Sequence, residues 1–213
     1  MRPRIKVCGL TRPEDARLAR EFGADFFGIV LYANSPRQVR AEALEVLLAA
    51  IPQGKRVAVD VAPAPGSLKK RRDQGFDFCQ IHYDPAEIPD KTLEDWLQEV
   101  GPDRLWLAPR LPSGVDFPAA ALRVAHTLVL DTYQKGAYGG TGRVGDWQHF
   151  KALSEKHPQH HWVLSGGLRP ENIRAALRAT SAKVVDVNSG VESAPGIKDT
   201  ALLDLFFANL AGS

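Results

Sequence analysis

The stretch that decides the fold is IKVCGLT, residues 5–11. Residues 5–7 are mostly apolar and have the length expected of a strand buried inside a parallel sheet. An open, doubly wound sheet that binds a dinucleotide would continue from its first strand into a G-x-G-x-x-G loop. The chain continues instead into Cys8-Gly9-Leu10-Thr11. The first strand and its loop therefore favour a closed barrel over an open sheet.

The rest of the chain repeats the same unit, a short apolar run followed by a helical segment. Seven further strands are expected at residues 26–31, 56–61, 78–82, 105–108, 127–130, 162–164 and 184–187. Helices are expected at residues 41–51, 66–74, 92–100, 146–156, 170–179 and 199–210. Residues 109–121 hold too much proline and glycine for a good helix and are expected to be mostly loop. Eight such units without a linker predict one (β/α)8-barrel domain spanning residues 1–213.

The first helix carries its own start and stop signals. Thr11 is a candidate N-cap, and Glu14 lies three residues later, as in a capping box. Pro13 suits the first turn of a helix, and Gly23 suits the residue that follows its end. We therefore expect a helix that begins close to Pro13 and ends before Gly23.

Composition narrows the class of protein. The 213 residues are 44% hydrophobic and 24% charged, which is typical of a folded globular domain. The 27 basic and 25 acidic residues give a net charge of only +2, so no strong field is expected to attract nucleic acid or an anionic membrane. The basic run at residues 69–72 is expected to be a solvated helix face. Two cysteines and the lack of a long apolar run indicate a cytoplasmic protein without membrane segments.

The loops after the last two expected strands contain paired small residues. Gly166 and Gly167 follow one strand, and Ser189 and Gly190 follow the next. In (β/α)8 barrels these two loops often bind phosphate, because glycine lets backbone N–H groups approach an anion closely. The alternative is that these glycines only make tight turns. Two such loops side by side favour a small phosphorylated ligand. The glycine-rich run at residues 139–142 lacks the Lys-Ser/Thr ending of a P-loop and is expected to be a lid or a wall of the site.

Two side chains at the ends of expected strands could exchange protons with such a ligand. Cys8 ends the first strand and Asp131 follows the sixth. A lone cysteine is more often a small buried apolar residue, and a strand-end aspartate is often only solvated. The carboxyl ends of the strands form the active site of barrel enzymes, however, so Cys8 and Asp131 could face a ligand from opposite sides. Cys79 falls inside a strand and is expected to be structural.

Longer motifs at the same places resemble one family, the phosphoribosylanthranilate isomerases. The opening KVCGLT resembles that family's K-[IV]-C-G-[IL]-T. The later motifs that carry the resemblance are LDT (130–132), YGGTG (138–142), DW (146–147), LSGGLRPEN (164–172), DVNSGVE (186–192), PG (195–196) and KD (198–199). They fall in the family's order from residue 6 to residue 199.

The resemblance implies an aldose–ketose isomerase of tryptophan biosynthesis that uses neither metal nor cofactor. In this family an Amadori rearrangement converts N-(5-phosphoribosyl)anthranilate to the corresponding ribulose phosphate. The matched motifs imply that Asp131 is the general acid and Cys8 the general base, and a base of this kind calls for a thiolate in an anion-stabilising pocket. They also imply that Arg37 contacts the anthranilate carboxylate, and that Gly166, Gly167, Ser189 and Gly190 hold the phosphate.

Three positions depart from the family pattern. Asp60 stands where the third strand usually reads GVFV, Tyr83 replaces the glycine of QLHG, and Gly145 replaces the phenylalanine of FDW. Asp60 could place a negative charge at the barrel mouth or cap the following loop. His82 could act beside the site or be a hydrogen-bonded core histidine, and we prefer the core role. These departures put substrate affinity and loop geometry in question, while the acid, the base and the phosphate loops are intact.

Two other functions compete with this one. A sugar-phosphate isomerase or epimerase, such as a ribulose-phosphate 3-epimerase, could use Asp60, His82 and Asp131 as metal ligands, although the expected His-x-Asp near the second strand is missing. A barrel that binds a phosphorylated ligand without catalysis is also conceivable, because fold alone does not determine function. We expect a monomer or a homodimer.

Overall fold

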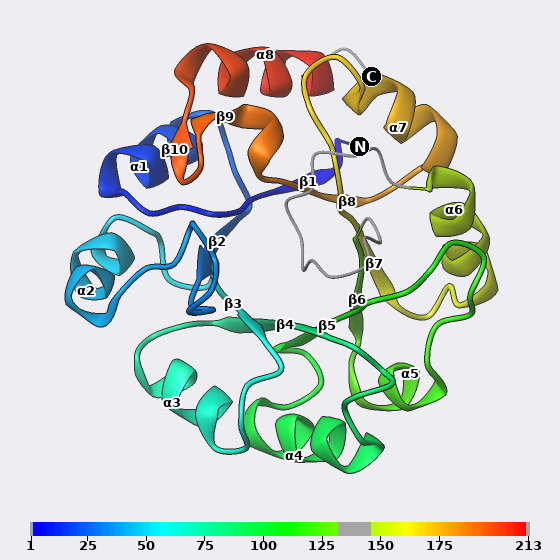
Figure 1. Cartoon of the computed structure of the whole chain (residues 1–213). Coiled ribbons are helices and arrows are strands. Elements are labelled where there is room, and N and C mark those ends of the chain that lie inside the picture. Colours follow the sequence, from blue (N-terminus) through cyan, green and yellow to red (C-terminus); the bar gives the residue numbers. More distant parts are fainter. Residues whose placement is uncertain (1, 132–145, 212–213) are drawn as a thin grey trace.

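Strand β1 (Arg4–Val7) hydrogen-bonds to β2 (Phe26–Val30) on one side and to β8 (Val184–Val187) on the other, so the sheet closes on itself. This computed structural model describes residues 2–131 and 146–211. Its eight parallel strands follow one another around the barrel in chain order (Figure 1). The strands between β2 and β8 are β3 (Arg56–Val61), β4 (Phe78–Tyr83), β5 (Leu105–Pro109), β6 (Thr127–Leu130) and β7 (His161–Leu164). The predicted (β/α)8 barrel is confirmed.

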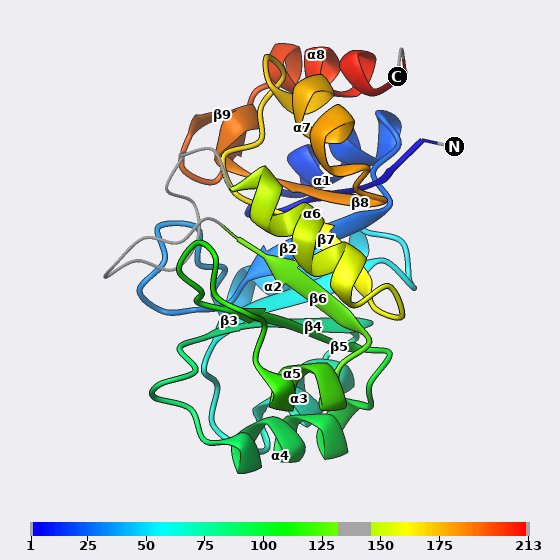
Figure 2. The same cartoon turned by 90° about the vertical axis from the view of Figure 1, so that its right-hand side faces the viewer.

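Helices surround the barrel and alternate with the strands (Figures 1 and 2). They are α1 (Pro13–Glu21), α2 (Ala41–Ala49), α3 (Ser67–Asp73), α4 (Asp90–Val100), α5 (Ala119–Val124), α6 (Trp147–Lys156), α7 (Ile173–Thr180) and α8 (Thr200–Ala211). Residues 109–121, expected to be mostly loop, overlap only the start of the six-residue α5. A 3₁₀ turn η1 (Ser189–Val191) and a small antiparallel hairpin, β9 (Glu192–Ala194) with β10 (Ile197–Lys198), lie between β8 and α8.

The start of α1 differs from the prediction. Arg12 occupies the N-cap position and no side chain caps the helix, so the predicted capping box at Thr11 is wrong. The Thr11 hydroxyl donates instead to the carbonyl of Gly196 at 2.6 Å, which ties the loop after β1 to the β9–β10 hairpin. Pro13 does begin the helix, and Gly23 follows its end with a φ of +93°, as expected. The Thr11 hydroxyl therefore bonds to a carbonyl that is distant in the sequence and does not accept from a backbone N–H group of α1.

Apolar side chains fill two separate layers. One lies inside the barrel, where Phe26, Phe78 and Trp106 cross with ring centroids 5.0 to 5.6 Å apart near the amino ends of their strands. The other lies between the barrel and the helices, and there Tyr83 packs on Trp96 at 6.0 Å. These aromatic residues fill the end of the barrel at which the strands begin. Polar side chains can therefore gather only toward the carboxyl ends of the strands.

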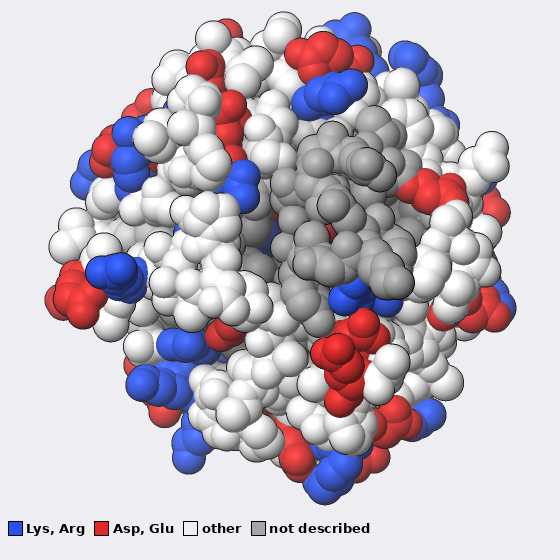
Figure 3. Space-filling model, viewed as in Figure 1, with Lys and Arg blue, Asp and Glu red and all other residues white. Residues whose placement is uncertain are grey.

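The surface carries charges of both signs. Lys and Arg are interspersed with Asp and Glu over the face drawn in Figure 3. On α3, Lys69, Lys70 and Arg72 are exposed, whereas Arg71 turns toward Asp60. None of the helices within residues 2–131 and 146–211 has both the length and the apolar character of a membrane span.

Candidate active site

A cavity of about 440 Å³ opens at the carboxyl ends of the strands. Its wall contains eight of the nine residues that the sequence singled out: Cys8, Arg37, Asp60, His82, Asp131, Gly166, Gly167 and Ser189. Gly190, the ninth, follows Ser189 in the turn η1. The barrel thus brings together residues spread over some 180 positions of the chain. The motif at residues 138–142 and Gly145 lie outside the described residues.

Cys8 lines this cavity and comes directly after β1. Its backbone N–H donates to the carbonyl of Val187 at 2.9 Å, and only 5% of the residue is exposed. Burial raises the pKa of the thiol, and a hydrogen bond and the charge of Lys6 oppose that rise without cancelling it. Lys6 is thus a positive charge that favours the thiolate of Cys8, as an anion-stabilising pocket would. In the free protein desolvation outweighs Lys6, and the thiolate that the family role calls for stays a prediction.

Asp131 follows β6 and faces the cavity from another side. Two strands, β7 and β8, separate β6 from β1 around the ring. The hydroxyl of Ser165, at the end of β7, donates to Oδ1 of Asp131 at 3.4 Å. An acid and a base on different walls of one cavity can act on two atoms of the same ligand.

The loops after β7 and β8 hold each other in place. Gly166 and Gly167 have φ values of +93° and +63°, a region that disfavours residues with a Cβ. Gly190 has no room for a side chain, because a Cβ there would overlap the carbonyl oxygen of Leu168. Asn172 closes the first loop by donating to the carbonyl of Gly167 at 2.8 Å.

Backbone donors of these loops are available to a ligand. Among the hydrogen bonds formed by the described residues, none uses the N–H groups of Gly166, Gly167, Ser189 or Gly190. Backbone N–H groups on glycine-rich turns form good anion-binding sites. These N–H groups could donate to an anion, and phosphate binding by these loops stays a prediction.

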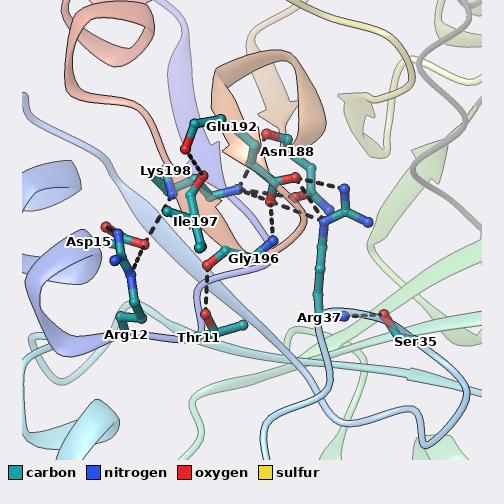
Figure 4. Close-up of polar contacts among 11 residues, drawn as sticks. Thr11, Arg12, Asp15, Ser35, Arg37, Asn188, Glu192, Gly196, Ile197 and Lys198 are labelled. Carbon is teal, nitrogen blue, oxygen red and sulfur yellow. Dashed lines mark hydrogen bonds and ion pairs between the residues drawn. The ribbon is translucent and has the colours of Figure 1, made fainter.

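Arg37 is held by a charge network that the sequence analysis did not find (Figure 4). Its Nη2 lies 2.6 Å from Oε2 of Glu192, and its Nε lies 3.0 Å from both carboxylate oxygens. Nζ of Lys198 also contacts Glu192, at 2.8 Å, and Oδ1 of Asn188 at 3.1 Å. Gly9 makes room for this arrangement, since a Cβ there would overlap Asn188 and the Arg37 side chain.

This network fixes the position of the Arg37 guanidinium but does not use all of its N–H groups. Only 12% of the Arg37 side chain and 3% of the Glu192 side chain are exposed. Burial raises the pKa of Glu192, but hydrogen bonds from Arg37 and the charge of Lys198 outweigh it, so that its pKa is lowered overall. The bonds formed within the described residues use Nε and Nη2 of Arg37, which leaves Nη1 for a ligand carboxylate. The sequence feature that could have indicated this network is a glutamate and a lysine close together in a short hairpin, Glu192 and Lys198.

His82 and Asp60 have local partners. Nε2 of His82 lies 3.0 Å from the Gln80 amide nitrogen, and burial lowers the pKa of His82 to about 4. Asp60 accepts from the N–H of Val61 at 2.9 Å and pairs with Arg71 at 3.5 Å, which compensates the extra charge. Tyr83 points into the layer between the barrel and α4, away from the cavity.

The alternative metal site finds no support in these positions. Among residues 2–131 and 146–211, no group of three His, Cys, Asp or Glu side chains is arranged to hold a metal ion. Cys79 is buried, and burial raises its pKa to about 12, which fits its predicted structural role.

The fold and the site together define a class: a (β/α)8-barrel enzyme with acid–base side chains and glycine loops suited to a phosphate. The family model described as "PRAI: N-(5'phosphoribosyl)anthranilate (PRA) isomerase" matches residues 5–209. The chain belongs to this family, the N-(5'-phosphoribosyl)anthranilate isomerases.

Individual relatives agree with this assignment. The N-(5'-phosphoribosyl)anthranilate isomerase of Nitrosococcus oceani is 38% identical and covers 97% of this chain and 96% of its own length. That of Aquifex aeolicus is 35% identical over 92% of both chains. Among solved structures, the isomerase from Thermus thermophilus superposes with a TM-score of 0.81 at 29% identity, covering 98% of both chains. Another isomerase, solved with reduced 1-(o-carboxyphenylamino)-1-deoxyribulose 5-phosphate, superposes with a TM-score of 0.76 at 29% identity, covering 99% of this chain and all of its own.

Proposed function

We propose that this chain isomerises N-(5'-phosphoribosyl)anthranilate to 1-(2-carboxyphenylamino)-1-deoxyribulose 5-phosphate, with Cys8 as general base and Asp131 as general acid. The observation that carries the proposal is the single cavity that Cys8, Asp131, Arg37 and the two glycine loops line together. The reaction is an aldose–ketose isomerisation and belongs to the biosynthesis of L-tryptophan.

The chemistry consists of proton transfers. Asp131 protonates the ring oxygen of the ribose, and the ring opens to a Schiff base of the anthranilate nitrogen. Cys8 then removes the proton from C2', and the electron pair moves to give an enamine. The enamine tautomerises to the ketone of the product. Each step needs only a correctly placed acid or base, so no cofactor enters the scheme.

The ligand would be held at its two ends. Backbone N–H groups of Gly166, Gly167, Ser189 and Gly190 would bind the phosphate, and Nη1 of Arg37 would bind the anthranilate carboxylate. A planar guanidinium already fixed on one edge by Glu192 loses little freedom when it binds a carboxylate on the other. His82 and Asp60 would flank the site without contacting the reacting atoms.

The proposal includes the state of the protein in the cell. A small phosphorylated molecule is its partner, and neither nucleic acid nor a membrane is required. One solved relative, from Thermotoga maritima, is described as a dimeric isomerase from which monomers were generated. A monomer or a homodimer in the cytoplasm fits this chain.

The decisive test is turnover of freshly prepared phosphoribosylanthranilate, followed by the loss of its fluorescence. Wild type, Cys8→Ala, Asp131→Asn and the control Cys79→Ser would be compared with and without EDTA. We expect activity that survives EDTA, stays near normal in Cys79→Ser, and falls by about 100-fold or more in both site variants. Turnover indifferent to Cys8 would reject the assigned mechanism. No turnover in wild type would favour the epimerase or the non-catalytic barrel, and loss of turnover with EDTA would show that the isomerisation needs a metal ion.

A further inference from the structure

An ion pair lies inside the barrel next to Cys8. Nζ of Lys6, on β1, is 2.8 Å from Oδ2 of Asp186, on β8, and the two side chains are 0% and 5% exposed. The residues are direct neighbours in the register of the two strands. Removing both charges from water is costly, and apolar side chains would fill the same space more favourably. An ion pair at this position therefore indicates a role other than stability.

Lys6 also acts on the proposed base, because its charge and hydrogen bonding oppose the rise that burial causes in the pKa of the Cys8 thiol. Gly28 on β2 makes room for both side chains, because a Cβ at that position would overlap Sγ of Cys8 and come within 3.0 Å of Nζ of Lys6. Three neighbouring strands therefore place one ammonium group between a thiol and a carboxylate.

The ion pair with Lys6 uses only one of the two carboxylate oxygens of Asp186. Within the described residues, its Oδ1 is buried and has no hydrogen-bond partner, although the residue lines the cavity. A buried carboxylate oxygen without a donor is unfavourable, and a hydroxyl group brought by a ligand would satisfy it.

We propose that the Lys6–Asp186 pair controls the charge of the Cys8 base: Lys6 stabilises the thiolate, and a ribose hydroxyl donating to Oδ1 of Asp186 weakens the hold of Asp186 on Lys6. The proposal rests on the proposed function, in which Cys8 removes a proton. In the free protein Lys6 is shared with Asp186 and the thiol keeps its proton. When the substrate supplies a hydroxyl to Asp186, Lys6 becomes available to the sulfur. The base is thereby activated only when the substrate is in place.

The charges around the sulfur have the signs that this control needs. Burial raises the pKa of Cys8, Lys6 and Lys198 of β10 act to lower it, and Asp186 acts to raise it. Burial lowers the pKa of Lys6, but the charge of Asp186 and the hydrogen bond to it act in the other direction, and the pKa of Lys6 is raised overall. His82 on β4 faces the same pair with its pKa lowered to about 4, so it is neutral. The carboxyl group of Asp131, which follows β6, acts to raise the pKa of Asp186.

The test is a pH titration of the Cys8 thiolate by its ultraviolet absorbance, in a Cys79→Ser background where Cys8 is the remaining cysteine. Asp186→Asn keeps the shape of the side chain and removes its charge, so the titration midpoint should fall by about one pH unit or more. Lys6→Met should raise the midpoint by a similar amount, while the exposed Lys151→Met should leave it unchanged. Midpoints in both site variants equal to the parent's would show that the pair is only structural and would overturn the proposal.

A second experiment, again a titration of Cys8, uses neither the Lys6→Met variant nor enzyme turnover. Ribose 5-phosphate supplies a phosphate and hydroxyl groups, whereas inorganic phosphate supplies no ribose hydroxyl. We expect ribose 5-phosphate to lower the Cys8 midpoint in the parent protein but not in Asp186→Asn, and inorganic phosphate to have no such effect. A shift of the same size with both ligands, or one that persists in Asp186→Asn, would exclude the hydroxyl contact. Because the titration does not depend on catalysis, it separates failure of this proposal from failure of the proposed function.

Discussion

His82 shows the cost of a titratable side chain inside the barrel. Its ring accepts from the Gln80 amide and lies beside the Lys6–Asp186 pair, where burial lowers its pKa from 6.5 to about 4. The sequence leaves two roles for His82, one beside the site and one as a hydrogen-bonded core histidine, and the core role is preferred. The structure shows the hydrogen bond to Gln80 on a half-buried residue. The residue also lines the cavity, so it belongs to the wall of the site as well.

This lowered pKa makes stability depend on pH. Below pH 6.5 the unfolded chain binds a proton at His82 that the folded protein does not bind until the pH approaches 4. The contribution of His82 to the free energy of unfolding is therefore fully present above pH 6.5. It is lost as the pH falls toward 4, and the loss is at most about 3 kcal/mol. Urea unfolding of wild type and His82→Gln at pH 7 and pH 4.5 measures it. The variant should lose less stability between the two pH values, and equal losses would contradict the prediction.

At the scale of elements, the β9–β10 hairpin is the support of Arg37. It carries Glu192 at its first residue and Lys198 at its last, and Thr11 anchors its turn through Gly196 (Figure 4). The N–H of Lys198 donates to Asp15 of α1 at 3.1 Å, so the hairpin is tied to the first helix too. A short element outside the barrel thus fixes a side chain at the barrel mouth.

Glu192→Gln should weaken both stability and substrate binding. The change leaves Arg37 and Lys198 buried without their shared counter-charge, which should cost about 3 kcal/mol of unfolding free energy. We expect KM for phosphoribosylanthranilate to rise about tenfold with a smaller change in kcat, because Arg37 loses its orientation rather than the acid or base. Steady-state kinetics and urea unfolding measure the two effects.

Glu171→Gln is the matched control, since Glu171 is 61% exposed and lies 3.5 Å from Arg169. It should change stability by less than about 0.5 kcal/mol. A Glu192→Gln enzyme with normal KM would show that the hairpin does not position Arg37.

At the scale of the whole molecule, the loops after β7 and β8, which we propose bind phosphate, contact each other although α7 and β8 lie between them in the chain. The loop after β7 precedes α7, and the loop after β8 precedes the hairpin and α8. Gly190 packs on the carbonyl of Leu168, so neither loop can move without the other. An anion bound between them should therefore stabilise the fold as a whole.

Inorganic phosphate should raise the midpoint of thermal unfolding. At a concentration of 100 times its Kd, the stabilisation by mass action is about 2.7 kcal/mol. For a protein of this size that corresponds to roughly 5 to 10 °C. Sodium chloride at equal ionic strength is the control. Ser189→Asp, which places a negative charge in the loop, should abolish the shift; an unchanged shift would place the anion elsewhere.

Much of this protein is determined locally and can be predicted from the sequence. The strands are mostly apolar runs, Pro13 fixes its own φ, and Gly23 permits the positive φ that it adopts. The motifs ending at Cys8, Asp131 and Gly167 lie at strand ends wherever those strands are placed. Because the carboxyl ends of all eight strands meet at one end of a barrel, the gathering of these residues follows from the fold class alone.

The tertiary structure decided what depends on neighbours from distant parts of the chain. Thr11 leaves its predicted capping role for a carbonyl 185 residues away, and Glu192 binds an arginine 155 positions earlier. The ionisation of Cys8 is set by burial and by a lysine shared with Asp186 of the last strand. Hydrogen bonds, charges and desolvation act through distances in space, and a sequence without its fold contains no such distances.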